Sequence, residues 1–235
     1  MTLRRAVVVD QGRRTFSSGA PTLDTILEGG FRTGEMVEVF GGSNTGKTLL
    51  SLQVAAIAAG AGFTTAIVDT EGQLRPERLA TVCRSRGLDP SEVLPSVFVM
   101  RAESTDRQLL VMSKLRGEAS LANCKLLVVD TLSKNFTLEY GGSKSVGKRQ
   151  TALGAYLNIL SRDAFLHDRA VILLNRVASV TVEGLDREVD IGGETVRHFA
   201  QKAVYLRRSL DYIMASRADL LGPEVRLRIK DEGLV

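Results

Sequence analysis

Short apolar runs alternate along the chain with longer segments of helical period. The apolar runs fall at 35–40, 64–70, 96–100, 125–130 and 170–175, and the helical segments at 47–59, 76–86, 105–118 and 148–168. Each run is almost continuously apolar, which is typical of strands in a sheet that helices cover on both faces. The pattern therefore predicts an α/β fold with a mostly parallel central sheet flanked by helices.

The pattern changes after Gly193. Two stretches, at 203–217 and 224–232, look like short strands, and we expect them to form a small antiparallel extension at the C-terminal end. We find no internal repeat, low-complexity tract or linker in the sequence. We therefore expect one domain, with an N-terminal arm at 1–15 and a core at 16–235.

The segment "GGSNTGKT" fits the phosphate-loop pattern G-x-x-x-x-G-K-[ST] and has the predicted strand before it and helix after it that this motif requires. It consists of Gly41, Gly42, Ser43, Asn44, Thr45, Gly46, Lys47 and Thr48. The glycines allow backbone N–H groups to surround phosphate oxygens at a helix N-terminus. We expect Lys47 to contact the β- and γ-phosphates of ATP and the Thr48 hydroxyl to bind Mg²⁺.

Two carboxylates at strand ends complete the predicted site. Asp130 closes the run "KLLVVD" and is the expected partner of Mg²⁺. Glu71 follows the strand after the phosphate-loop helix, where α/β sheets place their ligands, and is the candidate for orienting or deprotonating the attacking water. A solvated turn residue, or indirect support of the metal, is the alternative for Glu71. Asp69 fits such a supporting role better.

Composition and charge narrow the class of protein only a little. The chain has 31 Lys and Arg against 27 Asp and Glu, a net charge of +4 that permits nucleic-acid binding without establishing it. Cys83 and Cys124 are too few for a disulfide framework, and we expect both to be buried thiols in a reducing cytosol. The longest apolar stretch, 49–59, is too short to cross a bilayer.

Several stretches together resemble the RecA/RadA recombinase ATPases, and especially the archaeal RadB-type paralogues that lack the N-terminal domain. They include "FSSGAPTLDTILEGGFRTGEMVEVFGGSNTGKT", "VDTEGQLRPERL", "LLVVDT", "EYGGSKSVGKRQ", "LLNRV", "RHFAQKAVYLRR" and "RLRIKDEGL". The resemblance implies a RecA-type P-loop core in which Glu71 is catalytic together with Lys47. It also places Arg78 against adenine, where a planar guanidinium stacks well, although Arg78 also fits a solvated charge at a helix start.

The resemblance further implies two DNA-binding loops. The first aligns with "EYGGSKSVGKRQ", in which Lys144, Lys148 and Arg149 outweigh Glu139 and suit contacts to the phosphates of single-stranded DNA. Arg149 also fits an ordinary surface charge at the start of the next helix. The second loop aligns with 176–190, where four carboxylates oppose two arginines and no aromatic residue offers a stacking surface for bases.

Three residues are candidate sensors of the nucleotide by the same resemblance. Asn175 and Arg176 stand where the family has Asn-Gln, so the amide that links the γ-phosphate to the second loop is replaced by a guanidinium. His198 matches a family histidine near an ATP that bridges subunits. The segment 216–218 lacks the Asp and Pro of the family's cap over a neighbour's nucleotide. The run "FTTA" at 63–66 copies a polymerisation motif, but we expect it to be a buried core strand.

The leading hypothesis is an ATP-binding, weakly or DNA-dependently ATP-hydrolysing recombinase paralogue that binds single-stranded DNA and assists homologous recombination and repair. Its expected partners are the main recombinase or other recombination proteins, with a homo-oligomer also open. We expect it in the cytoplasm, associated with the nucleoid and not with a membrane. The alternatives are an autonomous strand-exchange recombinase and an assembly-switch ATPase of KaiC type that does not bind DNA.

Overall fold

The computed structural model describes residues 12–142, 145–182, 185–219, 222–231 and 233–235. Within these residues the main sheet contains eight strands in the order β12-β11-β10-β3-β7-β6-β4-β5. Their bounds are β3 Met36–Gly41, β4 Thr64–Asp69, β5 Val97–Arg101, β6 Cys124–Asp130, β7 Ala170–Asn175, β10 Lys202–Arg208, β11 Ile213–Arg217 and β12 Val225–Leu227. The strands from β10 to β5 in this order pair in parallel, and β11 and β12 add in antiparallel orientation.

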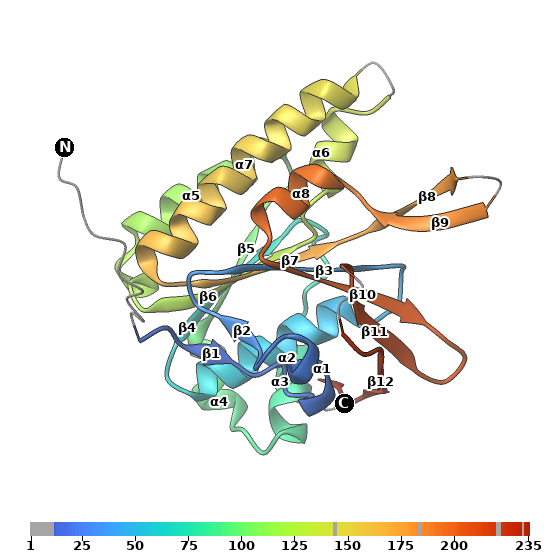
Figure 1. Cartoon of the computed structure of the whole chain (residues 1–235). Coiled ribbons are helices and arrows are strands. Elements are labelled where there is room, and N and C mark those ends of the chain that lie inside the picture. Colours follow the sequence, from blue (N-terminus) through green and yellow to red (C-terminus); the bar gives the residue numbers. More distant parts are fainter. Residues whose placement is uncertain (1–11, 143–144, 183–184, 220–221, 232) are drawn as a thin grey trace, which may run out of the picture.

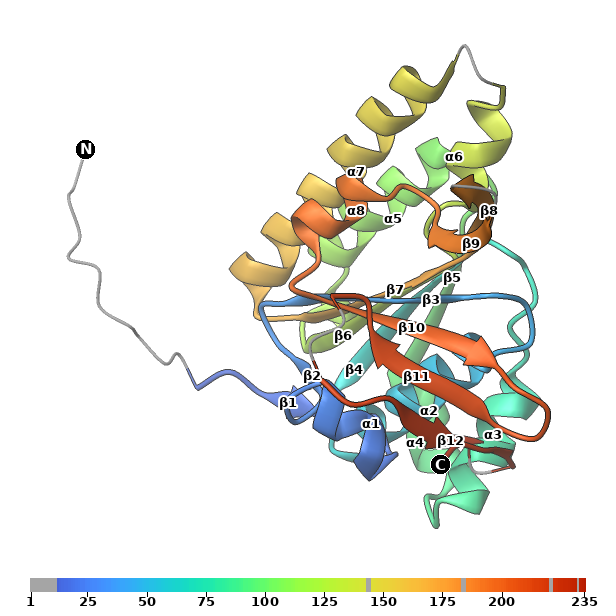
Figure 2. The same cartoon turned by 45° about the vertical axis from the view of Figure 1, so that its right-hand side comes forward.

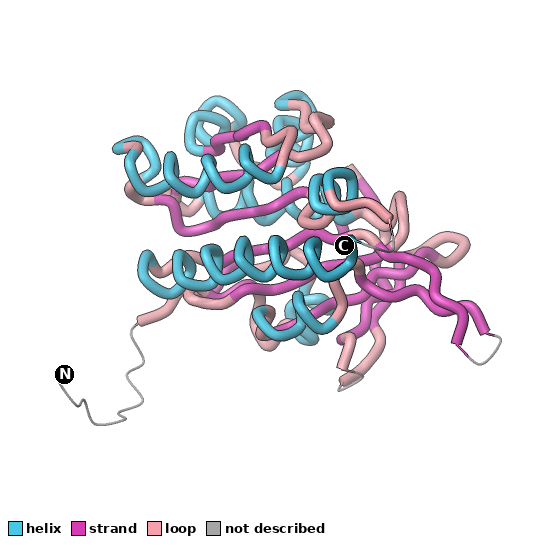
Figure 3. The backbone as a smooth tube through the Cα atoms, turned by 90° about the horizontal axis from the view of Figure 1, so that it is seen from above, coloured by secondary structure: helices cyan, strands magenta, loops and turns pink. Residues whose placement is uncertain are grey.

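Helices cover both faces of this sheet (Figures 1 and 3). One layer contains α1 Pro21–Ile26, α2 Lys47–Gly60, α3 Pro76–Ser85 and α4 Pro90–Val93. The opposite layer contains α5 Thr105–Gly117, α6 Lys134–Glu139, α7 Val146–His167 and α8 Glu194–Phe199. Short 3₁₀ turns at Leu94–Ser96 and Ala119–Leu121 lead into β5 and β6. The predicted α/β architecture with a mostly parallel sheet is confirmed.

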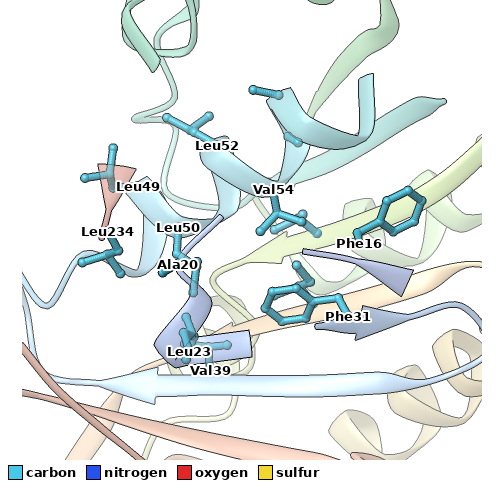
Figure 4. Close-up of a cluster of buried hydrophobic side chains, with 14 of the residues drawn as sticks. Phe16, Ala20, Leu23, Phe31, Val39, Leu49, Leu50, Leu52, Val54 and Leu234 are labelled. Atoms are coloured by element: carbon cyan, nitrogen blue, oxygen red, sulfur yellow. The ribbon is translucent and has the colours of Figure 1, made fainter. Parts of the chain in front are cut away.

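The apolar runs are continuous because the central strands are buried on both faces. All six residues of β7 are buried, and so are all six of β3. Figure 4 shows Val54 of α2 lying near Phe16 and Phe31, and Leu50 lying near Ala20; all five belong to the same core cluster. Burying each such side chain contributes roughly 1.5–3 kcal/mol, so α2 is fixed firmly beneath the sheet.

Three two-stranded sheets accompany the main sheet among the described residues. They pair β1 Thr15–Phe16 with β2 Phe31–Arg32, β8 Val177–Val182 with β9 Leu185–Asp190, and β13 Ile229–Lys230 with β14 Gly233–Leu234. The β8–β9 hairpin projects from the carboxyl end of β7 (Figure 1), and Glu188 of β9 accepts the hydroxyl of Tyr205 in β10. The segment 176–190, expected to be a loop, is thus largely an antiparallel hairpin.

The other predicted elements agree closely with the structure. The five predicted strands of the parallel sheet differ from the structure by at most one residue at either end, while α7 begins two residues earlier than the predicted helix. The antiparallel extension expected from 203–217 and 224–232 holds for β11 and β12, whereas β10 pairs in parallel with β3 and continues the parallel part of the sheet. Thr65 and Ala66 are buried in β4, which confirms that "FTTA" belongs to the core, and both cysteines are buried free thiols. Among the described residues, no helix combines the length and the apolar character needed to span a membrane.

Candidate active site

A cavity of about 760 Å³ opens at the carboxyl ends of β3, β4 and β6. Its walls come from the loop between β3 and α2, the turn after β4, the end of β6 and the β8–β9 hairpin. The volume lies within the range of ordinary ligand pockets. Parallel α/β sheets place their ligands at this edge because their strands end there together.

The phosphate loop depends on glycine at two positions. Gly46 directly precedes α2 with φ +86°, and a Cβ there would come within 2.9 Å of Leu234 Cδ2. At Gly41 a Cβ would lie 2.2 Å from the Leu206 carbonyl oxygen on the neighbouring strand β10. Both positions therefore require glycine, and the loop delivers its N–H groups to the first turn of a fourteen-residue helix.

Lys47 lies at the start of α2 and folds back over the loop. Its Nζ donates to the carbonyl oxygens of Gly41 and Gly42 at 2.8 and 2.6 Å. Burial lowers the pKa of Lys47, and the nearby positive charge of Arg176 acts in the same direction, while Asp130 opposes the shift. The ammonium group is thus kept inside the cavity beside the loop, as contact with a phosphate requires.

Thr48 and Asp130 meet across the cavity floor. The Thr48 hydroxyl donates to Asp130 Oδ2 at 2.7 Å. Burial raises the pKa of Asp130 to about 6, and the negative charges of Asp69 and Glu71 add to the shift. A hydroxyl and a buried carboxylate among further carboxylates fit a Mg²⁺ ion that takes its remaining ligands from phosphate and water.

Glu71 lies across the cavity from the loop, with its side chain only 17% exposed. Its Oε1 accepts hydrogen bonds from the Thr131 hydroxyl at 2.9 Å and from Arg176 Nη2 at 2.6 Å. Lys134 Nζ lies 3.8 Å from the other oxygen, Oε2. The carboxylate is therefore fixed by a hydroxyl and paired with a guanidinium contributed from beyond the end of β7.

Asp69 differs from Glu71 in its partners. Its carboxylate accepts the backbone N–H groups of Gly72 and Leu74 at 2.7 and 3.1 Å. These bonds shape the turn that carries Glu71, in agreement with the supporting role expected for Asp69.

Arg78 is exposed on α3 and lines the cavity. Arg75, in contrast, donates hydrogen bonds to the carbonyl groups of its own turn.

The β8–β9 hairpin contributes cavity residues that the sequence did not single out. Val177, Ser179 and Glu188 line the cavity beside Arg176. Glu188 Oε2 accepts the hydroxyl of Tyr205 at 2.6 Å, and burial together with Glu188 raises the pKa of Tyr205 to about 12. The available signal was the partly alternating pattern of apolar and polar residues at 177–182 and 185–190, two runs of strand length separated by two residues.

Asn175 and His198, two of the sensor candidates, lie outside the cavity lining. Asn175 is buried, and its Nδ2 donates to Glu38 Oε1 and to the Ile191 carbonyl oxygen, both at 2.7 Å. Its Oδ1 accepts the backbone N–H of Arg176 at 2.9 Å. His198 is exposed on α8 beside Phe199. Of the three candidates, the structure brings only Arg176 to the cavity.

Two of the three candidate DNA residues, Lys148 and Arg149, lie at the start of α7, away from the cavity lining. Lys148 is exposed and Arg149 half-buried in the first turn of α7, while Lys144 lies outside the described residues. In the sequence Glu139 is the negative charge that partly offsets these cations. In the structure its carboxylate accepts the backbone N–H of Thr105 at 2.8 Å. The N-terminal end of α7 and the β8–β9 hairpin project from the same side of the molecule (Figures 1 and 2).

These features define a class: a P-loop NTPase of RecA type, with the phosphate loop between β3 and α2, an aspartate at the end of β6 and a glutamate after β4. Residues 11–216 match the Rad51 family. The DNA repair and recombination protein RadA of Metallosphaera sedula is 33% identical over 217 residues, covering 88% of this chain and 67% of the relative. The RadA protein of Cenarchaeum symbiosum is 31% identical over 199 residues, covering 82% and 50%.

The chain therefore belongs to the Rad51 family, whose members are P-loop ATPases. The resemblance to the RecA/RadA recombinases is confirmed. The matched region spans between half and about two thirds of the length of these two relatives.

Proposed function

We propose that this protein is an ATP-binding and weakly ATP-hydrolysing recombinase paralogue of RadB type. It binds single-stranded DNA and assists homologous recombination and repair as an accessory protein, with residues 1–235 acting as one RecA-like core. The observation that carries the proposal is the convergence of Lys47, Thr48, Glu71 and Asp130 on one cavity. Ligand phosphates, a cation and an attacking water each have a matching group there.

Each of these residues has a chemical role in the proposal. The loop N–H groups and Lys47 bind the phosphates of ATP and stabilise charge on the transferred group. Thr48 and Asp130 would hold Mg²⁺, which would supply positive charge to neutralise the phosphates. Glu71 orients the attacking water and accepts its proton. Arg78 offers its guanidinium plane to the adenine ring.

The DNA part of the proposal is supported by charge. Lys148 and Arg149 lie in the first turn of α7, and with Lys144, which precedes them in the sequence, they supply three positive charges for contacts to DNA phosphates. The β8–β9 hairpin, in contrast, has a net negative sequence and directs Glu188 toward the cavity. A hairpin that repels phosphates favours an accessory role over autonomous strand exchange, and it suits a protein partner such as the main recombinase.

The decisive experiment measures the steady-state ATPase rate with and without single-stranded DNA, alongside light scattering for assembly. Lys47→Ala should abolish nucleotide binding or turnover, and Glu71→Gln should retain binding but hydrolyse at least about tenfold more slowly. Normal turnover by Glu71→Gln would remove Glu71 from its role. DNA-dependent filaments would favour the autonomous recombinase, in which the protein works as a homo-oligomer.

DNA binding is tested separately by retention on single-stranded DNA across a salt series. Affinity should fall with salt, and replacing Lys144, Lys148 and Arg149 by alanine should lower the slope by roughly 0.7 for each phosphate that the protein no longer neutralises. ATP hydrolysis without any salt-sensitive DNA binding would instead indicate the assembly-switch ATPase of KaiC type. Because the protein is proposed to bind DNA, we also propose a cytoplasmic location with nucleoid association, which fluorescence imaging can test.

A further inference from the structure

We infer that Arg176 alternates between two partners in the ATPase cycle: the carboxylate of Glu71 when no γ-phosphate is bound, and the γ-phosphate when ATP is bound. The inference rests on the proposed function and concerns how that same site is regulated. Arg176 thus restrains the catalytic glutamate until the correct nucleotide arrives, and it then contributes to binding that nucleotide.

The ion pair between Arg176 and Glu71 has one fixed and one adaptable member. Nη2 of Arg176 lies 2.6 Å from Glu71 Oε1, yet the arginine side chain is 52% exposed while the glutamate is 17% exposed. Glu71 is also held by the Thr131 hydroxyl and lies near Lys134. If the guanidinium leaves, the carboxylate therefore keeps its position and two of its neighbours.

A γ-phosphate competes for this guanidinium by ordinary charge chemistry. It offers several anionic oxygens that match the planar fork of arginine, whereas Glu71 presents one oxygen to Arg176. The two proposed partners of Arg176, Glu71 and the γ-phosphate, are in the same cavity. Glu71 lines it beside Arg176, and so do Lys47 and Thr48, the residues proposed to bind the phosphates and Mg²⁺. A diphosphate lacks the group that would draw Arg176 away, so only a triphosphate releases Glu71.

The release of Glu71 matters for hydrolysis because a general base needs a free oxygen. While Oε1 accepts a charged donor at 2.6 Å, its lone pair is engaged and is not free to accept a proton from water. The backbone of Arg176 is held at both ends of the residue: its N–H donates to Asn175 Oδ1 at 2.9 Å and its carbonyl oxygen accepts Ile191 N–H at 3.0 Å. The change of partner is therefore a movement of the side chain.

The experiment compares the binding of fluorescent ADP and of a non-hydrolysable fluorescent ATP analogue, and measures single-turnover hydrolysis of ATP. Arg176→Ala should leave ADP affinity within about twofold, weaken the triphosphate analogue about tenfold or more, and slow hydrolysis at least as much. Arg176→Lys should recover part of the triphosphate affinity, because it restores the charge but not the fork. Arg162→Ala, an exposed arginine of α7 away from the cavity, serves as control.

A double-mutant cycle separates a change of partner from a purely structural ion pair. Glu71→Gln removes the competing carboxylate and should raise triphosphate affinity in the wild-type background. In the Arg176→Ala background the same change should have a clearly smaller effect, since no guanidinium remains to be released. Additive effects, or an unchanged ratio of triphosphate to diphosphate affinity in Arg176→Ala, would overturn the inference.

The proposed function and the inference fail in distinguishable ways. If the wild-type protein binds neither nucleotide, the proposed function is wrong and the inference falls with it. If Lys47→Ala abolishes binding while Arg176→Ala leaves the affinity ratio unchanged, the ATPase proposal stands and only the inference is refuted. Equal weakening of ADP and the triphosphate analogue by Arg176→Ala would assign the ion pair a structural role, which also refutes it.

Discussion

At the scale of single residues, Glu38 is the most unusual group outside the cavity. It is buried in β3, and its Oε1 accepts the side-chain amide of Asn175, the residue before Arg176. Burial raises the pKa of Glu38 to about 8, the charge of Asp190 adds to the shift, and Asn175 and Arg197 oppose it. Oε2 of Glu38 and Oδ2 of Asp190 are buried without a hydrogen-bond partner among the described residues.

Glu38 should make the folded protein less stable as the pH rises. Its folded pKa of about 8 lies above the ordinary 4.5, so the folded state binds more protons than the unfolded chain between these values. The free energy of unfolding should therefore fall as the pH increases through this window, by up to about 1.4 kcal/mol per unit. Glu38→Gln keeps an acceptor for Asn175 and cannot ionise, so it should flatten the curve.

Urea titrations at intervals from pH 5 to pH 9 measure this dependence. The difference in unfolding free energy between Glu38→Gln and the wild type should grow in favour of the variant as the pH rises toward 8. Parallel curves for the two proteins would show that Glu38 ionises as readily in the folded protein as in the unfolded chain. Asp190 and Arg197 remain in both proteins, so their own effects largely cancel in the difference.

At the scale of elements, the β8–β9 hairpin forms one wall of the cavity and directs an acidic side chain into it. Glu188 lies near Gly42, since a Cβ at that glycine would be 3.7 Å from Glu188 Oε1, and it accepts the Tyr205 hydroxyl. Its charge also favours the protonated form of Lys47. A carboxylate beside the phosphate loop opposes each negative charge that a nucleotide brings.

Replacing Glu188 by glutamine should therefore strengthen nucleotide binding. The amide oxygen still accepts the Tyr205 hydroxyl, while the charge is lost, so affinity for a triphosphate should rise several-fold and affinity for ADP by less. Both affinities are measured by fluorescence titration at low and high salt, because screening should reduce the gain. Glu92→Gln, exposed on α4, is the matched control. If the gain in affinity depended neither on salt nor on the number of phosphates, the electrostatic explanation would be contradicted.

Most elements were predictable because they follow from local patterns. The run at 170–175 is apolar throughout because β7 is covered on both faces, and "GGSNTGKT" has the composition that a phosphate loop requires. The hairpin was missed because a resemblance to a DNA-binding loop outweighed its alternating residues. The contact between Arg176 and Glu71 joins residues 105 positions apart, and no local pattern reports such a pairing.

At the scale of the whole molecule, one side chain joins three distant segments. Gln53 of α2 donates to the carbonyl oxygens of Ser18 and Leu234 and accepts the Leu234 N–H at 2.8 Å. Leu234 in turn packs close to Gly46 beneath the phosphate loop. Figure 4 shows Leu234 beside Leu49 and Leu50 of α2. The first and last described strands are thus held against the helix that carries Lys47.

Gln53→Met should lower stability by more than any surface change. The substitution keeps the volume but leaves the buried groups of Ser18 and Leu234 without partners, at a cost of about 1–3 kcal/mol for each unsatisfied group. Urea unfolding measures the loss, with Gln73→Met, an exposed position, as control. Equal urea midpoints of unfolding for Gln53→Met and Gln73→Met would mean that the buried groups of Ser18 and Leu234 find other hydrogen-bond partners.

The hydrogen bonds between Gln53 and Leu234 also relate nucleotide binding to the order in which the chain is synthesised. Residues 233–235 leave the ribosome long after α2, yet Gln53 is satisfied only when Leu234 is in place, 181 positions later. Until then the helix that starts at Lys47 lacks part of its packing and its hydrogen bonds. A nascent chain would therefore acquire its affinity for nucleotide only after Leu234 has been made, and binding would favour chains that include residues 233–235 over shorter ones.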